Sequence, residues 1–186
     1  MRRIAIILIA VSLLWGCAAE NRDLSKALEM RNKLIQSQGC SFDAVITADY
    51  GEYIHSFEMQ CKTDSASALN FTVTKPDSIC GLSGQIEGKK GSITFEDQVL
   101  SFPTLAEGQI SPVSAPWVFY NTLKNGYFRS CAKEKQGYQL CLDDSYNDSA
   151  LQLDIWTDEN FQPIRADILW QGRRILCLSI TNYQIL

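Results

Sequence analysis

Apolar residues follow two different periods along this chain, and the change falls near Gly39. Between residues 21 and 38 they recur at helical spacing, at Leu24, Ala27, Leu28, Leu34 and Ile35. Arg31 interrupts the stripe. Asn21 can cap the start of the segment and Gly39 its end. The pattern predicts one amphipathic helix over residues 21–38.

After Gly39 the period becomes two. The stretches SFDAVITA, HSFEMQC and LNFTV each alternate apolar with polar residues, as in a half-buried strand. Turn signals, among them YG, KPD, EGKKG, FEDQ, KQG, TDEN and QGRR, separate such stretches. Parallel strands would need long crossovers for which the chain has no room. We therefore predict a meander of antiparallel strands.

One segment interrupts the alternation. SPVSAPWVFYNTLKNGYF, from Ser111, is typical of a short helix that begins near Pro116 and ends at Gly126. The predicted order is a helix, about five strands, a helical insertion and about five more strands. The stretches RADILWQG and RRILCLSITNY are apolar on both faces over part of their length. The two helices are the elements expected to cover those faces.

The chain opens with a separate apolar segment, MRRIAIILIAVSLLWGCAAE. Arg2 and Arg3 precede an apolar run of about a dozen residues, which is the length of a signal-peptide core and shorter than the about 20 residues that span a bilayer. Leu14-Trp15-Gly16-Cys17 resembles the bacterial lipobox, although Trp15 is bulkier than usual. An ordinary signal peptide with an incidental cysteine is the alternative.

The lipobox resemblance implies a particular domain organisation. Residues 1–16 are expected to be a signal peptide, residues 17–20 a lipidated tether, and residues 21–186 a single domain. Two or more acyl chains, such as palmitate, on Cys17 would anchor the protein stably at the extracytoplasmic face of the cell membrane. About four residues separate Cys17 from the predicted helix, so the tether reaches only about 14 Å.

Charge and cysteine content narrow the picture further. The formal net charge is −4, without a run of Lys and Arg, which argues against nucleic-acid binding. Six cysteines besides Cys17 in an exported chain suggest disulfides. If the turns centre on Tyr50-Gly51 and on Gln136, the pairs Cys40-Cys61 and Cys131-Cys141 lie directly opposite each other, and Cys80-Cys177 follows by exclusion. Free thiols are the alternative; a zinc site is disfavoured because C-x-x-C is absent from the sequence.

The whole predicted domain resembles the LolA/LolB-like lipoprotein-carrier superfamily. The resemblance is carried by YGEYIHSFEMQC, by the progression from LNFTVTKPDSICGLSGQIEGKKG to SITFEDQVL, by SPVSAP, and by IWTDENFQPIRADILWQGRRILCLSITNY. It implies an α+β fold, in which a curved antiparallel sheet of about 10–11 strands forms an open half-barrel. The N-terminal helix and the helical insertion would cover its concave face. The chain also resembles the anchored branch found in spore-forming Gram-positive bacteria.

Two functions follow from this reading. The first is binding of a hydrophobic ligand, such as an acyl chain or the lipid of a lipoprotein, in a cavity on the concave face. The candidate lining residues are Phe42, Ile46, Phe57, Met59, Phe71, Phe95, Trp117, Trp156 and Trp170. For each of these residues, simple core packing is the competing interpretation. The second function is a non-catalytic scaffold or regulator for an envelope protein, such as a cell-wall hydrolase in sporulation or germination.

An enzyme is disfavoured by the sequence. His55 is the single histidine, and no serine lies in G-x-S-x-G. The carboxylate pairs fall in predicted turns, where acidic residues are common. We therefore expect no catalytic residue, no metal site and no cofactor.

Overall fold

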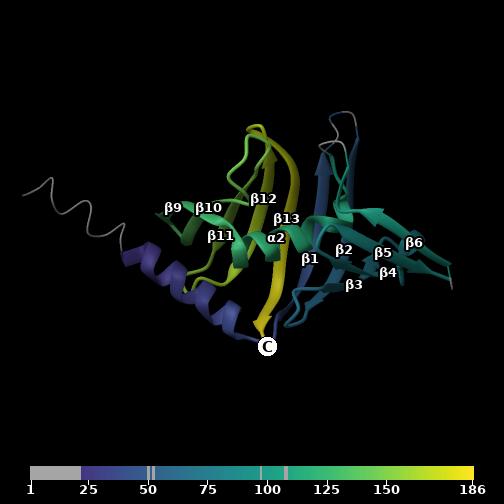
Figure 1. Ribbon diagram of the computed structural model, residues 1–186, viewed down its shortest axis with the longest axis horizontal. Helices are drawn as coiled ribbons and strands as arrows, with labels where there is room; N and C mark the ends of the chain where they lie inside the picture. The colour runs from purple at the N-terminus through teal and green to yellow at the C-terminus, as the bar shows by residue number, and fades with distance from the viewer. Residues whose placement is uncertain (1–21, 50, 52, 97, 107–108) are drawn as a thin grey trace, which may run out of the picture.

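The computed structural model describes residues 22–186, apart from residues 50, 52, 97 and 107–108. Eleven antiparallel strands form one sheet in the order β6-β5-β4-β3-β2-β1-β13-β12-β11-β10-β9 (Figure 1). The sheet does not close into a barrel, because β6 and β9 lie at its two edges. The lipobox and the tether at Cys17 lie outside the described residues.

The first half of the sheet is a meander of six strands: β1 (Cys40–Asp49), β2 (Ile54–Thr63), β3 (Leu69–Lys75), β4 (Ser83–Glu87), β5 (Lys90–Phe95) and β6 (Gln98–Pro103). A 3-10 turn, η1 (Asp77–Ile79), separates β3 from β4. A small separate hairpin follows, formed by β7 (Leu105–Ala106) and β8 (Gln109–Ile110). The YG and FEDQ turn signals lie between paired strands, as predicted.

The second half begins with the predicted helical insertion, which is the 3-10 turn η2 (Pro112–Ser114) followed by α2 (Ala115–Asn125). Five strands complete it: β9 (Tyr127–Glu134), β10 (Gly137–Asp143), β11 (Leu151–Thr157), β12 (Pro163–Trp170) and β13 (Arg173–Ile185). Gln171 and Gly172 both have positive φ in the QGRR turn, as a tight two-residue hairpin requires.

The two halves meet at the pairing of β1 with β13, in which Cys40 lies opposite Ile185. Backbone hydrogen bonds extend this pairing, from Gln38 N–H to Leu186 O at 3.1 Å and from Leu186 N–H to Gly39 O at 2.9 Å. The C-terminus consequently lies beside the start of β1, near the middle of the sheet (Figure 1).

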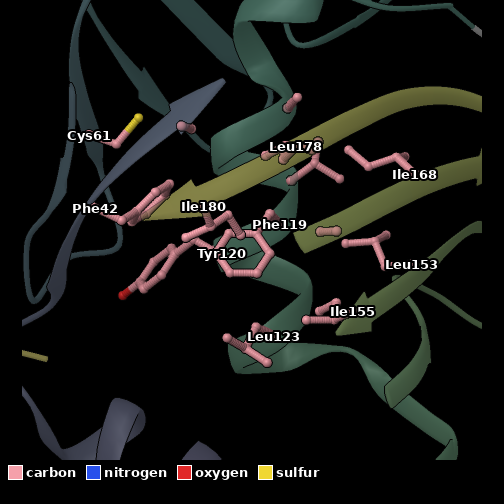
Figure 2. Packing of buried hydrophobic residues seen from close by; sticks show 14 of the residues in the cluster. Phe42, Cys61, Phe119, Tyr120, Leu123, Leu153, Ile155, Ile168, Leu178 and Ile180 are labelled. Carbon is pink, nitrogen blue, oxygen red and sulfur yellow. The ribbon is translucent and has the colours of Figure 1, made fainter. Parts of the chain in front are cut away.

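Both helices pack on the same face of the sheet. α2 buries Phe119, Tyr120 and Leu123 completely against the strands, beside Leu153, Ile155, Ile168, Leu178 and Ile180 (Figure 2). The N-terminal helix, which spans residues 22–36, buries Ala27, Met30 and Leu34. The predicted fold class, an open curved antiparallel sheet with two helices, is confirmed.

The contacts of Arg31 explain why this charged residue interrupts the apolar stripe of the N-terminal helix. Its Nε donates to Leu123 O and its Nη1 to Gly126 O, both at 2.8 Å, and its guanidinium lies 4.1 Å from the centre of the Phe128 ring. Carbonyl groups at a helix C-terminus carry partial negative charge. Arg31 thus joins the N-terminal helix to the end of α2.

Candidate functional site

The middle of the concave face, where we expected ligand-lining residues, is filled by packed side chains. Phe42, Ile46, Met59 and Phe71 are at most 3% exposed. The rings of Phe42 and Phe119 meet edge to face, with their centroids 5.5 Å apart. These four residues are brought together, but as part of one buried core cluster, in which Phe42 lies near Phe119 of α2 (Figure 2).

The other candidate lining residues are dispersed. Phe57 and Trp170 lie half-buried against the core, and Trp117 donates its indole N–H to Ser67 O at 3.3 Å. Phe95 is 43% exposed at the end of β5. Trp156 lies on the opposite face of the sheet, because it alternates with the buried Ile155 and Thr157; its ring stacks under Arg165 at 4.7 Å. The prediction that Trp156 faces the cavity is therefore wrong.

The cysteine registers differ from those we predicted. The β1–β2 loop is longer than a turn at Tyr50-Gly51, so Cys61 lies opposite Phe42 rather than opposite Cys40. The β9–β10 turn ends one residue earlier, so Cys141 lies opposite Ser130 and, by alternation, on the other face from Cys131. The six cysteines of the described chain, Cys80 and Cys177 included, are free thiols.

Burial keeps most of these thiols protonated. It raises the pKa of Cys40 and of Cys131 to about 11, and it raises the pKa of Cys61 further still. Burial together with the adjacent Asp154 raises the pKa of Cys141 to about 11, and the Cys141 thiol donates to Asp154 Oδ1 at 2.8 Å. A protonated thiol is a poor nucleophile and a poor metal ligand.

Two of the carboxylates expected in turns, Asp144 and Asp158, accept backbone hydrogen bonds there. Asp158 Oδ1 accepts the N–H groups of Asn160 and Gln162, each at 2.8 Å, and Asp144 Oδ1 accepts the N–H of Leu151 at 2.8 Å. His55 is exposed on β2. Within the described ranges, no group of three or more His, Cys, Asp or Glu could hold a metal ion.

A cleft of about 750 Å³ lies at the rim of the sheet, where the N-terminal helix faces the β11–β12 turn and the end of β13. Its lining residues are Lys26, Glu29, Met30, Lys33, Glu159, Asn160, Phe161, Gln162, Tyr183, Gln184 and Ile185. Among the described residues that line it, none is one of the nine that the sequence suggested.

The floor of this rim cleft is apolar and firmly held. Met30, Phe161 and Tyr183 are 5–8% exposed. Phe161 has a φ of 61°, fixed by the Asp158 turn, and its ring stacks on Tyr138 with the centroids 4.1 Å apart. Burial and the neighbouring Cys40 thiol raise the pKa of Tyr183 far above its usual value, so its hydroxyl stays protonated.

The rim of the cleft is charged and exposed. Lys26, Glu29 and Lys33 project from the N-terminal helix, and Glu159 projects from the opposite turn. An apolar floor under a charged rim matches a ligand with an apolar body and a polar end.

Sequence reasoning missed this site because its three walls are far apart in the chain. The helical stripe did predict that the N-terminal helix has a buried face. Nothing in the pattern indicated that this face ends against residues 159–162.

Comparison with known proteins gives similarity of fold only. No protein-family model matches the chain, and no curated protein sequence matches it significantly. An uncharacterised conserved protein from Thermus thermophilus is similar in structure, with 14% identity, a TM-score of 0.48, and coverage of 86% of this chain and 87% of that one.

Two further solved structures carry more informative descriptions. A LolA superfamily protein from Nitrosomonas europaea has 12% identity, a TM-score of 0.47, and coverage of 86% of this chain and 93% of its own. A putative outer membrane lipoprotein-sorting protein domain from Vibrio parahaemolyticus has 9% identity, a TM-score of 0.48, and coverage of 89% and 92%.

Proposed function

We propose that this protein is a non-catalytic, membrane-anchored extracytoplasmic lipoprotein that binds a hydrophobic ligand, such as an acyl chain, in the rim cleft. The observation that carries the proposal is the cleft itself, with its buried floor of Met30, Phe161 and Tyr183 and its charged rim. An acylated Cys17 and a place in the anchored branch of spore-forming bacteria belong to the same proposal.

The dimensions and chemistry of the cleft support this function. Its volume of about 750 Å³ falls within the range of roughly 300–1,000 Å³ that is typical of small-molecule sites. Met30 has an unbranched, flexible side chain that adapts to chains of different shape. The rim offers both signs of charge to a polar head group, from Lys26 and Lys33 and from Glu29 and Glu159.

The expected anchor would place the cleft near its source of ligand. Four residues separate Cys17 from Arg22, the first residue of the described helix. That helix forms one wall of the cleft. A lipidated Cys17 would therefore hold the cleft within a few nanometres of the bilayer, where acyl chains are abundant.

Ligand binding can be tested with Ile185, which lines the cleft and is 39% exposed. Ile185→Asp places a carboxylate against the proposed path of the chain and removes apolar contact worth about 1.5 kcal/mol or more, so a fluorescent C16 fatty acid should bind at least about tenfold more weakly. The measurement is a fluorescence titration of the chain that begins at Ala18.

The matched control is Ile164→Asp. Ile164 is 46% exposed on β12 and is not a lining residue of the cleft, so this variant should bind like the unchanged protein. Absence of fatty-acid binding by the unchanged protein, or equal losses in both variants, would contradict the proposed site.

A further inference from the structure

The two edges of the sheet differ in how they are protected. β6 (QVLSFP) carries no charged side chain, and its Val99 and Leu100 are 69% and 67% exposed. The opposite edge strand, β9 (YFRSCAKE), carries Arg129, Lys133 and Glu134. Edge strands usually carry charges that oppose pairing with another chain. Only β6, of the two edges, is open to such pairing.

Among the described residues, none forms a backbone hydrogen bond with the outward-facing groups of β6. Lys90 lies opposite Pro103, and Thr104 N–H donates to Lys89 O at 3.1 Å. Because bonded and non-bonded positions alternate along an antiparallel pair, the even-numbered residues of β6 bond to β5. The N–H and C=O groups of Val99 and Ser101 therefore point away from the sheet.

The two ends of β6 carry opposite charges. Glu96, exposed in the turn before β6, lies at one end, and Lys89 and Lys90, also exposed, flank the other end. An antiparallel neighbour with the same sequence would bring its acidic end beside the basic end of this copy. The charge pattern is thus complementary to itself.

We propose that β6 pairs with β6 of a second copy of this chain, in an antiparallel two-fold arrangement with Leu100 opposite Leu100 of the second copy. Val99 then lies opposite Ser101 of the second copy. Each of these two residues donates its outward N–H to the other and accepts a hydrogen bond on its outward C=O. A two-fold interface of this kind closes on itself and forms a dimer.

The register follows from the sequence of the strand. Side chains of residues that lie opposite each other must be on the same face of the sheet. The register can therefore shift only by an even number of residues. Centring the pair on Ser101 would place Pro103 opposite Val99, and Pro103 has no N–H to donate. Centring on Leu100 satisfies all the free groups of Val99 and Ser101.

Cross-linking of the full chain in bacterial membranes tests this pairing. Leu100 would form a non-hydrogen-bonded pair with Cα atoms about 4.5 Å apart, which is within the disulfide range. Leu100→Cys, in a background with the exposed Cys80 changed to Ser, should therefore give a band of twice the monomer mass after mild oxidation. Lys133→Cys, on the opposite edge, should give at least fivefold less.

Charge variants examine the same interface independently. Glu96→Lys in the Leu100→Cys chain should reduce the dimer band at least threefold, and adding Lys90→Glu should restore it. Equal bands from Leu100→Cys and Lys133→Cys, or no dimer band, would overturn the proposal. A cross-link to a different protein would also overturn it and would assign β6 to another envelope partner.

Discussion

At the scale of single residues, Arg31 shows how a break in a pattern can carry structural information. In the sequence it only interrupts the apolar stripe of a helix. In the fold its guanidinium reaches two carbonyl groups at the end of α2, 92 and 95 positions further along the chain. Burial lowers the pKa of Arg31 from its ordinary value, yet the guanidinium stays charged. Its partners could not be predicted, because no local pattern reports contacts between distant elements.

Replacing Arg31 should weaken the attachment of the N-terminal helix. Arg31→Met removes two charge-assisted hydrogen bonds, so we expect the free energy of unfolding to fall by about 3 kcal/mol, measured by urea denaturation. Lys33→Met, at an exposed position of the same helix, should change it by less than about 0.5 kcal/mol. Equal effects of the two substitutions would show that Arg31 contributes no specific contact.

At the scale of elements, the strands and both helices could be predicted from period and turn signals, whereas the registers could not. The N-terminal helix, expected over residues 21–38, is helical over residues 22–36. The two cysteine pairs failed because a shift of one or two residues in a turn moves every opposing pair. Turn length depends on backbone geometry that a sequence pattern does not specify.

Gly137 allows a close approach between the start of β10 and the end of β11. It has a φ of 109°, and a Cβ at this position would collide with Thr157 O. Gly137→Ala should lower the free energy of unfolding by more than 2 kcal/mol, since it adds a backbone clash to the roughly 1 kcal/mol cost of positive φ. Gly172→Ala, with a φ of 77° and no described atom within 4 Å of the added Cβ, should show only the smaller cost. Thermal denaturation of both variants measures these losses of stability. Similar losses in the two variants would exclude the collision with Thr157 O.

At the scale of the whole molecule, the candidate site depends on how three distant segments meet. The sequence suggested an apolar and aromatic lining, but four of the residues to which it assigned that lining, Phe42, Ile46, Met59 and Phe71, form part of the core. α2 occupies the middle of the concave face, so the available space lies at the rim instead. No helix of the described chain is long and apolar enough to cross a bilayer.

Membrane attachment is the prediction that concerns the protein as a whole. Cys17→Ala should abolish acylation and should either release the protein from membranes or stall its processing, because the remaining contacts lack the buried acyl chains. Fractionation of cells followed by immunoblotting measures the outcome. Normal cleavage with unchanged membrane retention would rule out a lipid anchor at Cys17.

The pairing of β1 with β13 has a consequence for biogenesis. Each half of the sheet is a local meander, but the strands that join the halves, β1 and β13, are the first and the last along the described residues. Leu186 bonds to Gly39 at the start of that seam, so the sheet cannot be completed before β13 is available. For a chain exported as we propose, β1 would lack one of its two neighbours in the sheet until β13 has also crossed the membrane.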